Sequence, residues 1–484
     1  MSNLQTKLMN RLCLLEMWER FGFYGMRSLL TLFIIKQLGF NEGKAYLIYG
    51  LYAATCYIVP VLGGFLADRL LGYKNLLFSG SVLMCLGHYT LTFLSSNETL
   101  LYIGIAFIAI GTGFFKGNIS NMLGSIYGEH NSKDRDNGFR RFYIAINFGS
   151  FIASILCGVV AEIYGWKYAF GLAGTGMTIG LLTLIASKNI LKDYGNPPKN
   201  LKSKLKGTIY ISSFSYILGI ILVSITTIMF FYYEASIKLI SVAGLLILLH
   251  LVYITSKFDK KSQKGILFLV MMLFFFMVMF ALEMQLGSFI NLFTDKHVNR
   301  DVLGIMIPTA SLQALNPLTI IVLGSLVSYL LRKTSAKFSL VIFGTGFLMS
   351  CICFAILYIG CHYYDADHKI NISFLVTAMI FLALSEIMMA PIMQSVVTYI
   401  APAKIRGYMM GFLSLCLSYS NLLGSMILKY MLNIDKTIIA SSDSLASLYN
   451  YQNCFLKVTI AFVIVAIIYL MLYKTMMRIY TSFN

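Results

Sequence analysis

One apolar stretch that carries charges most constrains what this chain can fold into. The run of residues 12–40 is long enough to cross a bilayer as one helix. The charged and aromatic side chains of its first half fall within about 140° of one helix face: Glu16, Glu19, Arg20, Phe23, Tyr24 and Arg27. An ionisable group at membrane depth costs on the order of 2.5–3.5 kcal/mol, so this face requires partners or a wet cavity. The stretch therefore predicts other helices that enclose a polar interior, although ion pairs that only fix helix packing remain an alternative.

The composition indicates the class of protein. Of the 484 residues, 58% are hydrophobic and 12% are charged, against roughly 25% charged in ordinary soluble domains. We therefore expect a multi-pass helical membrane protein embedded in a lipid bilayer. The formal net charge of +18 suggests nucleic acid at first, but Lys and Arg gather in alternate loops, as orientation in a membrane requires. We expect no nucleic-acid partner and no cleavable signal peptide.

Fourteen apolar stretches of spanning length are predicted. They lie at about residues 12–39, 44–70, 74–95, 99–127, 140–163, 167–186, 208–232, 235–256, 266–293, 302–331, 337–362, 372–400, 405–433 and 453–473. The loops between them alternate between basic sequences and short mixed or acidic ones. A missed or invented helix would scramble this alternation, so we expect a plasma (inner) membrane protein with both termini in the cytoplasm.

Two basic loops divide the predicted helices. The polar run at residues 188–207 contains Pro197-Pro198 and six lysines, and it separates six helices from eight. The loop at residues 257–264 sets off the last six. We expect an all-α major facilitator fold of two six-helix bundles, residues 1–187 and 265–484. A basic linker with an extra transmembrane hairpin, residues 188–264, lies between them. In this architecture the substrate site is near the midplane.

The junction of the second and third helices supports this fold. Residues 63–72 read Gly-Gly-Phe-Leu-Ala-Asp-Arg-Leu-Leu-Gly, which resembles the Gly-x-x-x-Asp-Arg loop of that superfamily. We expect Asp68 and Arg69 to lock or release a cytoplasmic gate, with an ordinary tight turn as the alternative.

Two further charges lie deep inside predicted spans, Lys116 in the fourth helix and Glu386 in the tenth, with Glu283 as a third in the seventh. Lys116 and Glu386 could form an ion pair or bind the two ends of a zwitterion. The polar side chains around them are Tyr57, Tyr143, Asn147, Gln285, Gln313, Asn316 and Ser385. Each alone is explained by hydrogen bonds between helices, but the set with both charge signs favours a substrate and proton path.

No sequence pattern indicates catalysis. The chain shows no metal-ligand set, nucleophile–base pair or phosphate loop, and the nine cysteines fall mostly in apolar spans. We therefore expect a protein that is not an enzyme and uses no cofactor or metal. A membrane-embedded enzyme or a signalling receptor remains an alternative of a different class.

The chain resembles the proton-dependent oligopeptide transporter family, the peptide transporters, in its bacterial form. Residues 16–25 resemble the family's Glu-x-x-Glu-Arg-Phe-x-Tyr-Tyr-Gly signature, with Phe23 in place of the first tyrosine. Residues 142–150 resemble its Phe-Tyr-x-x-Ile-Asn-x-Gly-Ser pattern, and residues 313–317 and 385–391 resemble its eighth- and tenth-helix motifs.

This resemblance implies proton-driven import of di- and tripeptides by alternating access, with the proton gradient as energy source and a functional monomer. It implies proton coupling at Glu16, Glu19, Arg20 and Glu386. The substrate-binding residues it implies are Arg20, Tyr24, Arg27, Tyr57, Lys116, Asn147, Gln285, Asn316 and Glu386. Gating is implied for Asp68, Arg69 and Lys116.

Three departures from the family pattern leave the substrate open. Gln285 stands where many members have an acid, and Glu283 lies about 200° around the helix from it. Gly117 replaces a proline, and Phe23 removes a hydroxyl from the expected pocket. A transporter of the same fold for an amino acid, nitrate, nucleoside or drug is therefore the runner-up.

Overall fold

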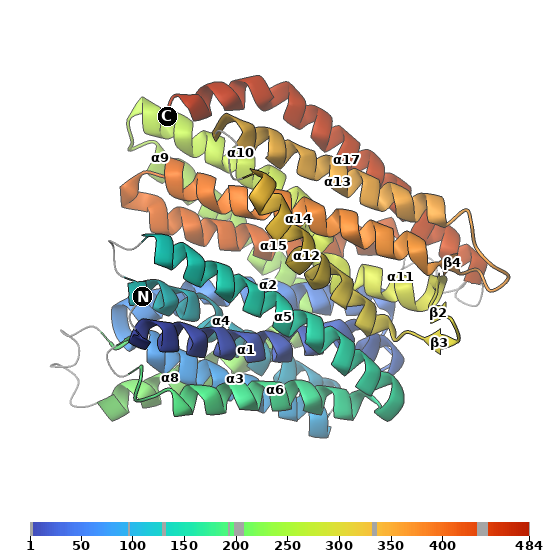
Figure 1. Ribbon diagram of the computed structural model, residues 1–484, viewed down its shortest axis with the longest axis horizontal. Coiled ribbons are helices and arrows are strands. Elements are labelled where there is room, and N and C mark those ends of the chain that lie inside the picture. Colours follow the sequence, from blue (N-terminus) through green and yellow to red (C-terminus); the bar gives the residue numbers. More distant parts are fainter. Residues whose placement is uncertain are drawn as a thin grey trace. The chain divides into compact units, whose positions relative to one another are not determined.

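Long helices make up most of the part of the chain that the computed structural model describes, residues 3–94, 97–127, 132–191, 194–197, 208–331, 336–432 and 444–483 (Figure 1). The helices of the first half are α1 (Asn3–Lys36), α2 (Glu42–Leu66), α3 (Tyr73–Leu94), α4 (Glu98–Tyr127), α5 (Ser132–Tyr164), α6 (Trp166–Ala186) and α8 (Thr208–Phe231). Those of the second half are α9 (Tyr233–Thr255), α10 (Lys260–Glu283), α11 (Phe289–His297), α12 (Leu315–Leu331), α13 (Ala336–Gly360), α14 (Ile372–Ile400), α15 (Arg406–Met431) and α17 (Ser444–Thr481).

Short irregular segments join some of these helices. The π-helical turn η1 (Ala67–Leu71) follows α2, and the 3-10 segments are η2 (Met284–Gly287), η3 (Thr309–Ala314) and η4 (Ala403–Ile405). The strands are β1 (Val298–Asn299), β2 (Asp301–Val302), β3 (Ile305–Met306) and β4 (Ile370–Asn371). β1 pairs in parallel with β4, and β2 pairs antiparallel with β3.

Twelve helices among the described residues are long and apolar enough to cross a membrane. Two further segments fall on predicted spans: α1, which has 34 residues but carries charges, and the shorter apolar helix Thr309–Gly324. The prediction of an all-α polytopic membrane protein is confirmed.

Two of the predicted spans are not single helices. The span at residues 266–293 breaks into α10, η2 and α11, because the backbone leaves helical geometry at Ser288 (φ −124°, ψ −82°). The span at residues 302–331 begins instead with the β2–β3 hairpin and then η3, because Pro308 is extended (ψ 138°) and ends the possibility of a continuous helix.

Residue contacts divide the chain into two compact units. Unit 1 contains Met1–Phe40, Leu51–Tyr233 and Ile307–Pro317, and unit 2 contains Asn41–Gly50, Glu234–Met306 and Leu318–Asn484. The helix α2 therefore contributes its first turns to unit 2 and the rest to unit 1. The two helices of the predicted extra hairpin, α8 and α9, fall in different units. The three-part division predicted at residues 187/188 and 264/265 stays a prediction.

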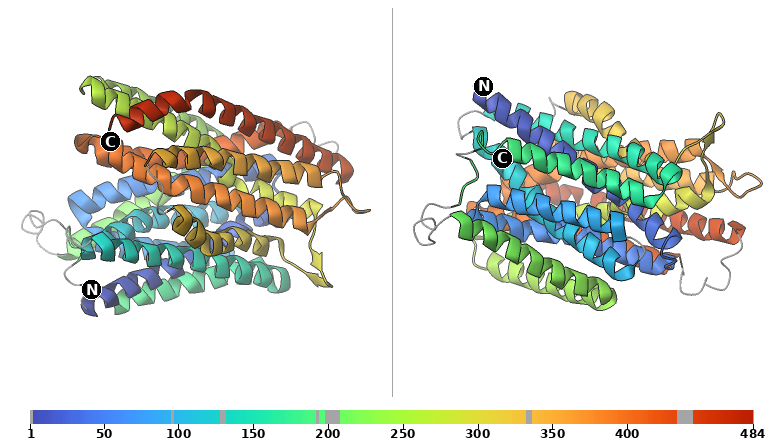
Figure 2. Two further views of the ribbon diagram at one scale, coloured as in Figure 1. Left: turned by 45° about the horizontal axis from the view of Figure 1, so that its top comes forward. Right: turned by 90° about the horizontal axis from the view of Figure 1, so that it is seen from below.

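Close backbone approach holds unit 1 together. A Cβ on Gly80 would lie 2.7 Å from the Gly111 carbonyl oxygen, and one on Gly104 would lie 2.7 Å from Leu91 Cδ2, so glycines let α3 and α4 pack tightly. This is the small-residue packing that favours helix association in lipid. The helix α1 runs beside α5 and α6 (Figures 1 and 2).

Aromatic packing is prominent in unit 2. The helix α13 lies against α14 and α17. The ring of Tyr469 contacts those of Phe275 and Phe347 at centroid distances of 5.2 and 5.7 Å, and its hydroxyl donates to the Leu340 carbonyl at 2.6 Å. The buried hydroxyl is thus satisfied inside an apolar core.

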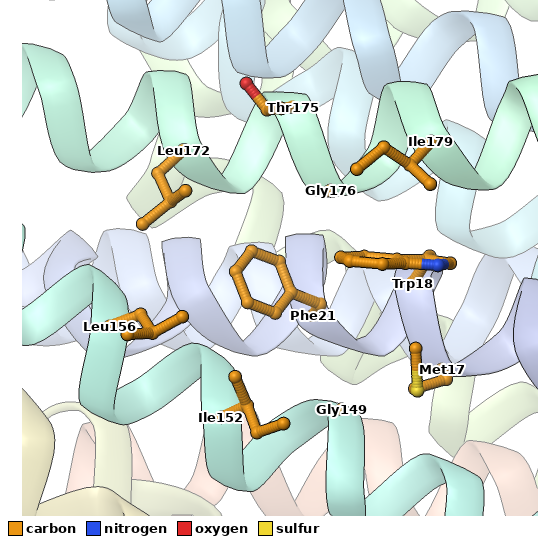
Figure 3. A pocket seen from close by; sticks show the side chains of 10 residues that line it. All are labelled: Met17, Trp18, Phe21, Gly149, Ile152, Leu156, Leu172, Thr175, Gly176 and Ile179. Atoms are coloured by element: carbon orange, nitrogen blue, oxygen red, sulfur yellow. The ribbon is translucent and has the colours of Figure 1, made fainter.

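Unit 1 also contains an apolar pocket of about 200 Å³ among α1, α5 and α6 (Figure 3). Its lining residues are Met17, Trp18, Phe21, Gly149, Ile152, Leu156, Leu172, Thr175, Gly176 and Ile179. The polar side-chain groups of this lining are the indole N–H of Trp18 and the hydroxyl of Thr175, which donates to the Gly171 carbonyl at 2.9 Å. The rest of the lining is hydrocarbon.

Candidate functional site

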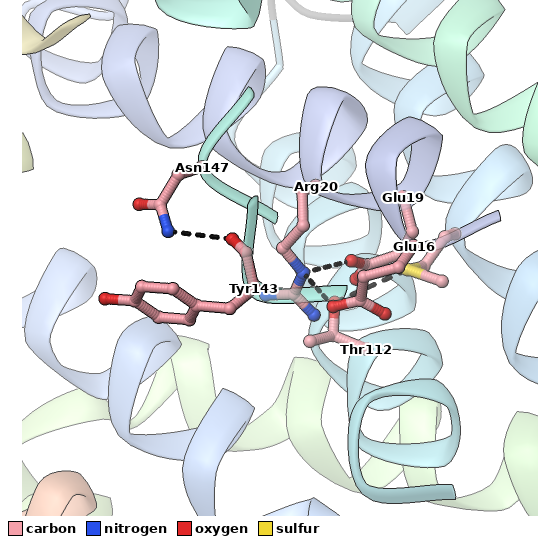
Figure 4. A network of polar contacts seen from close by, with 7 residues as sticks. Glu16, Glu19, Arg20, Thr112, Tyr143 and Asn147 are labelled. Carbon is pink, nitrogen blue, oxygen red and sulfur yellow. Dashed lines mark hydrogen bonds and ion pairs between the residues drawn. The ribbon is translucent and has the colours of Figure 1, made fainter. Parts of the chain in front are cut away.

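The charged stretch of α1 forms a buried ion cluster in unit 1. Arg20 Nε lies 2.9 Å from Glu16 Oε1 and 2.5 Å from Glu19 Oε2 (Figure 4). Glu16 and Arg20 are each 2% exposed, and Glu19 is fully buried. The sequence prediction that these three residues act together is consistent with this geometry, because one guanidinium contacts both carboxylates.

Local sequence and helix packing both produce this cluster. Residues 3–36 contain no proline and form one uninterrupted helix, so Glu16 and Arg20 meet across one turn. The helix α5 approaches at Gly149, where a Cβ would lie 2.3 Å from the Met17 carbonyl oxygen and 3.3 Å from Arg20 Cβ. A larger residue at position 149 would push α5 away from the charged turn.

Several buried atoms of the cluster have unused hydrogen-bonding capacity. Glu16 Oε2, Glu19 Oε1 and Arg20 Nη2 make no hydrogen bond within the described part of the chain. Buried polar atoms normally have a partner, so such atoms mark a place where water, a proton or a ligand is bound. The cluster can accept a proton on either carboxylate and an anion at the free edge of the guanidinium.

Aromatic rings and two further cations surround the cluster in unit 1. Lys116 Nζ lies 4.0 Å from the centroid of the Tyr57 ring, and Arg27 Cζ lies 5.7 Å from that of Tyr24. Lys116 also interacts electrostatically with the charges of the α1 cluster. Cation–π contact lowers the cost of burying these cations without neutralising them. The structure thus brings Lys116, Tyr24 and Tyr57 to the same region, as expected.

Phe23 keeps part of the role expected of the tyrosine it replaces. Its ring centroid lies 5.3 Å from Arg20 Cζ. A phenylalanine supplies this contact as a tyrosine would, because the ring face and not the hydroxyl attracts the guanidinium. The packing of residue 23 on Arg20 therefore does not need the hydroxyl.

Asn147 and Asn316 also belong to unit 1. Asn147 is 7% exposed, and its Nδ2 donates to the Tyr143 carbonyl of its own helix at 3.0 Å (Figure 4). Asn316 is 9% exposed at the start of α12. The preceding segment packs on unit 1, because Gln313 Nε2 donates to the Ser28 carbonyl at 3.2 Å.

Sequence reasoning missed this association of η3 with the first half of the chain. Ser311 Oγ donates to the Ile155 carbonyl at 3.1 Å, and a Cβ on Gly158 would lie only 2.3 Å from that hydroxyl oxygen. Pro308 and Pro317, which flank the segment, are the one sequence signal that it departs from an ordinary span.

Gln285 lies in unit 2, where its amide oxygen and its amide nitrogen both have hydrogen-bond partners. Its Oε1 accepts from Ser288 Oγ at 2.7 Å and from Ser425 Oγ at 3.4 Å, and its Nε2 donates to the Asn421 carbonyl at 3.1 Å. The side chain is completely buried. In this structure Gln285 cross-links η2 to α15, and its expected contact with substrate stays a prediction.

Glu386 is the other expected site residue in unit 2. It is half-buried on α14, one turn before Pro391. The adjacent Ser385 donates to the Gly346 carbonyl at 2.8 Å and lies 2.9 Å from Ser350 Oγ, which fixes this turn against α13.

The expected gate residues Asp68 and Arg69 lie in η1. Asp68 Oδ1 accepts from the Tyr73 hydroxyl at 2.6 Å, and Arg69 Cζ lies 6.0 Å from the Phe65 ring. Gly72 has φ 73°, and a Cβ there would lie 2.5 Å from Pro197 N. Glycine is therefore required for both the left-handed turn and the close approach of residues 194–197. The gating role of Asp68 and Arg69 stays a prediction.

Among the described residues, no group of three or more His, Cys, Asp and Glu side chains could hold a metal ion. The site that the structure describes contains two acids, cations and aromatic rings.

Comparison with known proteins places the chain in a family. The family model described as POT family matches residues 74–445. "Dipeptide and tripeptide permease A" of Escherichia coli (strain K12) is 26% identical over 461 residues, which cover 94% of this chain and 90% of the relative. "Dipeptide and tripeptide permease B" of Shigella dysenteriae serotype 1 (strain Sd197) is 28% identical over 481 residues, covering 96% and 94%.

Solved structures show the same fold. A mutant of the peptide transporter POT in complex with alafosfalin is 25% identical, with TM-score 0.82 over 98% of this chain and 95% of that one. A bacterial homologue of the human drug peptide transporters PepT1 and PepT2 is 24% identical, with TM-score 0.84 over 99% and 100%. These likenesses confirm the predicted major facilitator fold. The chain therefore belongs to the POT family, and it is a multi-pass membrane transporter, not an enzyme.

Proposed function

We propose that this chain is a proton-coupled symporter that imports di- and tripeptides by alternating access. The observation that carries the proposal is the buried cluster on α1, in which Arg20 contacts Glu16 and Glu19 while Nη2 keeps a free hydrogen-bond donor. Two permeases named for dipeptides and tripeptides match over nearly their full length, which supports peptides as the substrate class.

The charges of unit 1 suggest how a proton and a peptide are linked. Two carboxylates and three cations, Arg20, Arg27 and Lys116, sum to +1, so one bound proton raises the sum to +2. Protonation of Glu16 or Glu19 also weakens its hold on the guanidinium. The substrate carboxylate is then attracted more strongly, and by linkage the bound peptide favours the protonated state to the same extent.

The remaining predicted roles follow from the same chemistry. In the proposal, Arg20, Arg27 and Lys116 attract the peptide carboxylate, and Asn147, Asn316 and Glu386 hold its amino end. Tyr24 and Tyr57 line the pocket, while Gln285 contacts substrate from unit 2. Asp68 and Arg69 serve the cytoplasmic gate. A zwitterion of fixed span fits this division, because peptides share their ends and differ only in side chains.

We also propose that both termini are cytoplasmic and that a single chain is the functional unit. The basic loops support the first statement, because positively charged loops remain on the cytoplasmic side. The presence of both acids and cations of the α1 cluster in one chain supports the second.

The test is uptake into proteoliposomes with an imposed inward proton gradient and radiolabelled dialanine. We expect gradient-dependent accumulation that unlabelled di- and tripeptides compete and free alanine does not. Competition by free alanine, or accumulation only of a nucleoside, nitrate or drug, would replace peptides by the runner-up substrate class.

Two variants test the coupling residues. Glu16→Gln and Lys116→Ala should abolish gradient-driven accumulation, and Glu16→Gln should retain exchange of peptide for peptide, which needs no net proton movement. Glu162→Gln, at an exposed glutamate near the end of α5, is the matched control and should transport normally. Unchanged accumulation in both test variants would rule out the coupling role of the cluster.

A further inference from the structure

The apolar pocket among α1, α5 and α6 has no part in the proposed transport chemistry. Its α1 residues are Met17, Trp18 and Phe21. They alternate along the helix with the charged residues, but their side chains line the apolar pocket and not the ion cluster. Figure 3 shows the Phe21 ring and the Trp18 indole between α6 and α5. Leu156 of the lining is 44% exposed. The pocket is thus open at Leu156, which lies on α5, a helix of membrane-spanning length.

Glycines shape this pocket. A Cβ on Gly176 would lie 2.3 Å from Phe21 Cδ1, and one on Gly149 would lie 2.3 Å from the Met17 carbonyl oxygen. Gly149 lets the backbones of α1 and α5 approach, Gly176 makes room for the Phe21 ring, and the larger side chains around them leave the cavity of about 200 Å³. In a bilayer an apolar groove that opens to the outside is filled by hydrocarbon.

Two arginines lie on the same helix faces as the pocket residues, nearer to one end of unit 1. Arg11 precedes Trp18 by seven residues on α1, and Arg141 precedes Ile152 by eleven on α5, so each shares its helix face with a pocket residue to within about 20°. Arg11 and Arg141 therefore lie about 10 and about 16 Å along their helices from these residues. Both are exposed, and among the side chains that the structure describes, which do not include those of residues 132–136, neither has a salt-bridge partner.

The two arginines lie on the same end of their helices. The helices α1 and α5 pack against each other, and both arginines precede the pocket residues, near the starts of helices that begin at Asn3 and Ser132. Arg141 also interacts electrostatically with Cys13 on α1, two residues beyond Arg11. Positive charge is thus gathered at one end of a groove that is otherwise hydrocarbon.

From this arrangement we infer that the groove is a binding site for an anionic phospholipid, with its phosphate at Arg11 and Arg141 and one acyl chain in the pocket beside Trp18. Charge complementarity selects the headgroup, because arginine binds phosphate oxygens in a bidentate manner. The apolar lining accepts the chain but gives no preference among lipids. Each arginine should contribute roughly a fivefold preference for an anionic over a zwitterionic lipid.

The bound lipid would stabilise the α1 cluster through α5. Gly149 lines the pocket and also contacts the backbone of Met17 next to Arg20. A chain held against α5 at this point keeps α5 packed on the turn that carries the ions. The stability of the cluster should therefore depend on the lipid composition of the membrane.

Trp18 supplies a direct readout once the other of the two tryptophans, Trp166, is changed to phenylalanine, which keeps an aromatic ring beside Phe33. The full-length Trp166→Phe variant is reconstituted in phosphatidylcholine vesicles that contain either phosphatidylglycerol or phosphatidylcholine brominated at mid-chain. We expect brominated phosphatidylglycerol to quench Trp18 fluorescence at a several-fold lower mole fraction than brominated phosphatidylcholine. Equal quenching by both lipids would show ordinary annular hydrocarbon and would overturn the proposal.

Two changes separate a specific site from general surface charge. Arg11→Gln with Arg141→Gln should remove the preference for phosphatidylglycerol, whereas Arg140→Gln, which removes an adjacent exposed charge about 100° around α5, should keep it. Ile152→Phe, which fills the groove and leaves the arginines, should reduce quenching by both lipids. Loss of the preference in Arg140→Gln to the same extent, or its survival in the double variant, would contradict the site. Thermal unfolding of each variant confirms that the comparison is made on folded protein.

Discussion

The buried polar clusters around Arg20 in unit 1 and around Gln285 in unit 2 differ in how many of their polar atoms are hydrogen-bonded. In unit 1, Arg20 contacts Glu16 and Glu19, and three buried atoms of this cluster have neither a hydrogen bond nor an ion-pair contact in the described part of the chain. In unit 2, the amide of Gln285 uses both its oxygen and its nitrogen in contacts with Ser288, Ser425 and Asn421. Both lie in helices of membrane-spanning length.

The difference separates a cluster that can change its charge from one that only holds helices. Burying ions that lack hydrogen-bond partners costs free energy, and ionisable groups at such positions in a membrane are typically functional. A satisfied neutral amide costs little and cross-links η2 to α15. Four changes test whether this contrast is real.

The largest effect is expected from Arg20→Met. Removing the guanidinium leaves two buried carboxylates without compensation, which costs about 3–5 kcal/mol of folding free energy at neutral pH. Thermal unfolding of the purified variant in detergent measures the loss. A triple variant with Glu16→Gln and Glu19→Gln added should recover much of the stability, since it removes the charges as well. A single variant as stable as the parent would mean that the cluster is hydrated and not buried.

Gln285→Glu should convert the satisfied cluster into an unsatisfied one. A carboxylate cannot donate to the Asn421 carbonyl, and the new charge has no cation among the three partners of Gln285. We expect a loss of about 3 kcal/mol at pH 7.5 that shrinks in acid, where the carboxyl group can take up a proton. Gln285→Met, similar in length and uncharged, is the control and should lose less. Equal unfolding temperatures for the parent and the glutamate variant would contradict the description of this cluster as closed.

His297 offers a neutral cluster in unit 2 outside the membrane-spanning segments. It is 1% exposed, with Nε2 2.9 Å from Ser447 Oγ and Nδ1 3.4 Å from the His368 carbonyl oxygen. Because that carbonyl only accepts, Nδ1 carries the proton and the Ser447 hydroxyl donates to Nε2. Burial lowers the pKa of His297 from 6.5 to about 4.

The sign of the pH effect follows from this shift. The unfolded chain binds a proton more readily than the folded one, so the stabilisation is complete above about pH 6.5 and declines as the pH falls toward 4. The loss amounts to about 1 kcal/mol at pH 5.5. We expect unfolding temperatures of His297→Gln to fall less than those of the parent between pH 7.5 and 5.5. Parallel curves for the two proteins would show that His297 does not contribute to the pH dependence of stability.

The smallest effect is expected from Glu42→Gln. Glu42 forms an ion pair with Lys296 in unit 2, but the two side chains are 24% and 37% exposed. Water and salt screen such a pair, so its removal should cost less than about 1 kcal/mol and less still at high salt. A loss as large as that of Arg20→Met would show that burial does not explain the contrast between the clusters.

Much of the site was predictable because it depends on spacing along one helix. The four-residue interval between Glu16 and Arg20 places them together on any helix, and an apolar flank around charges indicates a membrane interior. Lys116 was found by the same criterion on α4. Its contact with the ring of Tyr57, 59 residues earlier (116 − 57), was expected only as membership of one pocket.

Other features were beyond sequence reasoning because they depend on partners far along the chain. The Gln285 amide meets Asn421 across 136 residues, and Gln313 meets Ser28 across 285. Neither pairing leaves a period or a motif in the sequence. The break at Ser288 and the apolar pocket beside Trp18 were missed for the same reason.

The amino-acid sequence by itself determined that the chain crosses a membrane many times, that α1 carries charges through it, and which family motifs accompany them. These properties follow from hydropathy and helical periodicity, which act over a few residues. Only the tertiary structure decided which buried polar groups are satisfied, that η3 packs in unit 1, and that α1, α5 and α6 leave a groove between them. Those outcomes depend on how closely helices approach, as at Gly149 against the Met17 backbone and at Gly176 against the Phe21 ring, and on contacts between residues far apart in the chain.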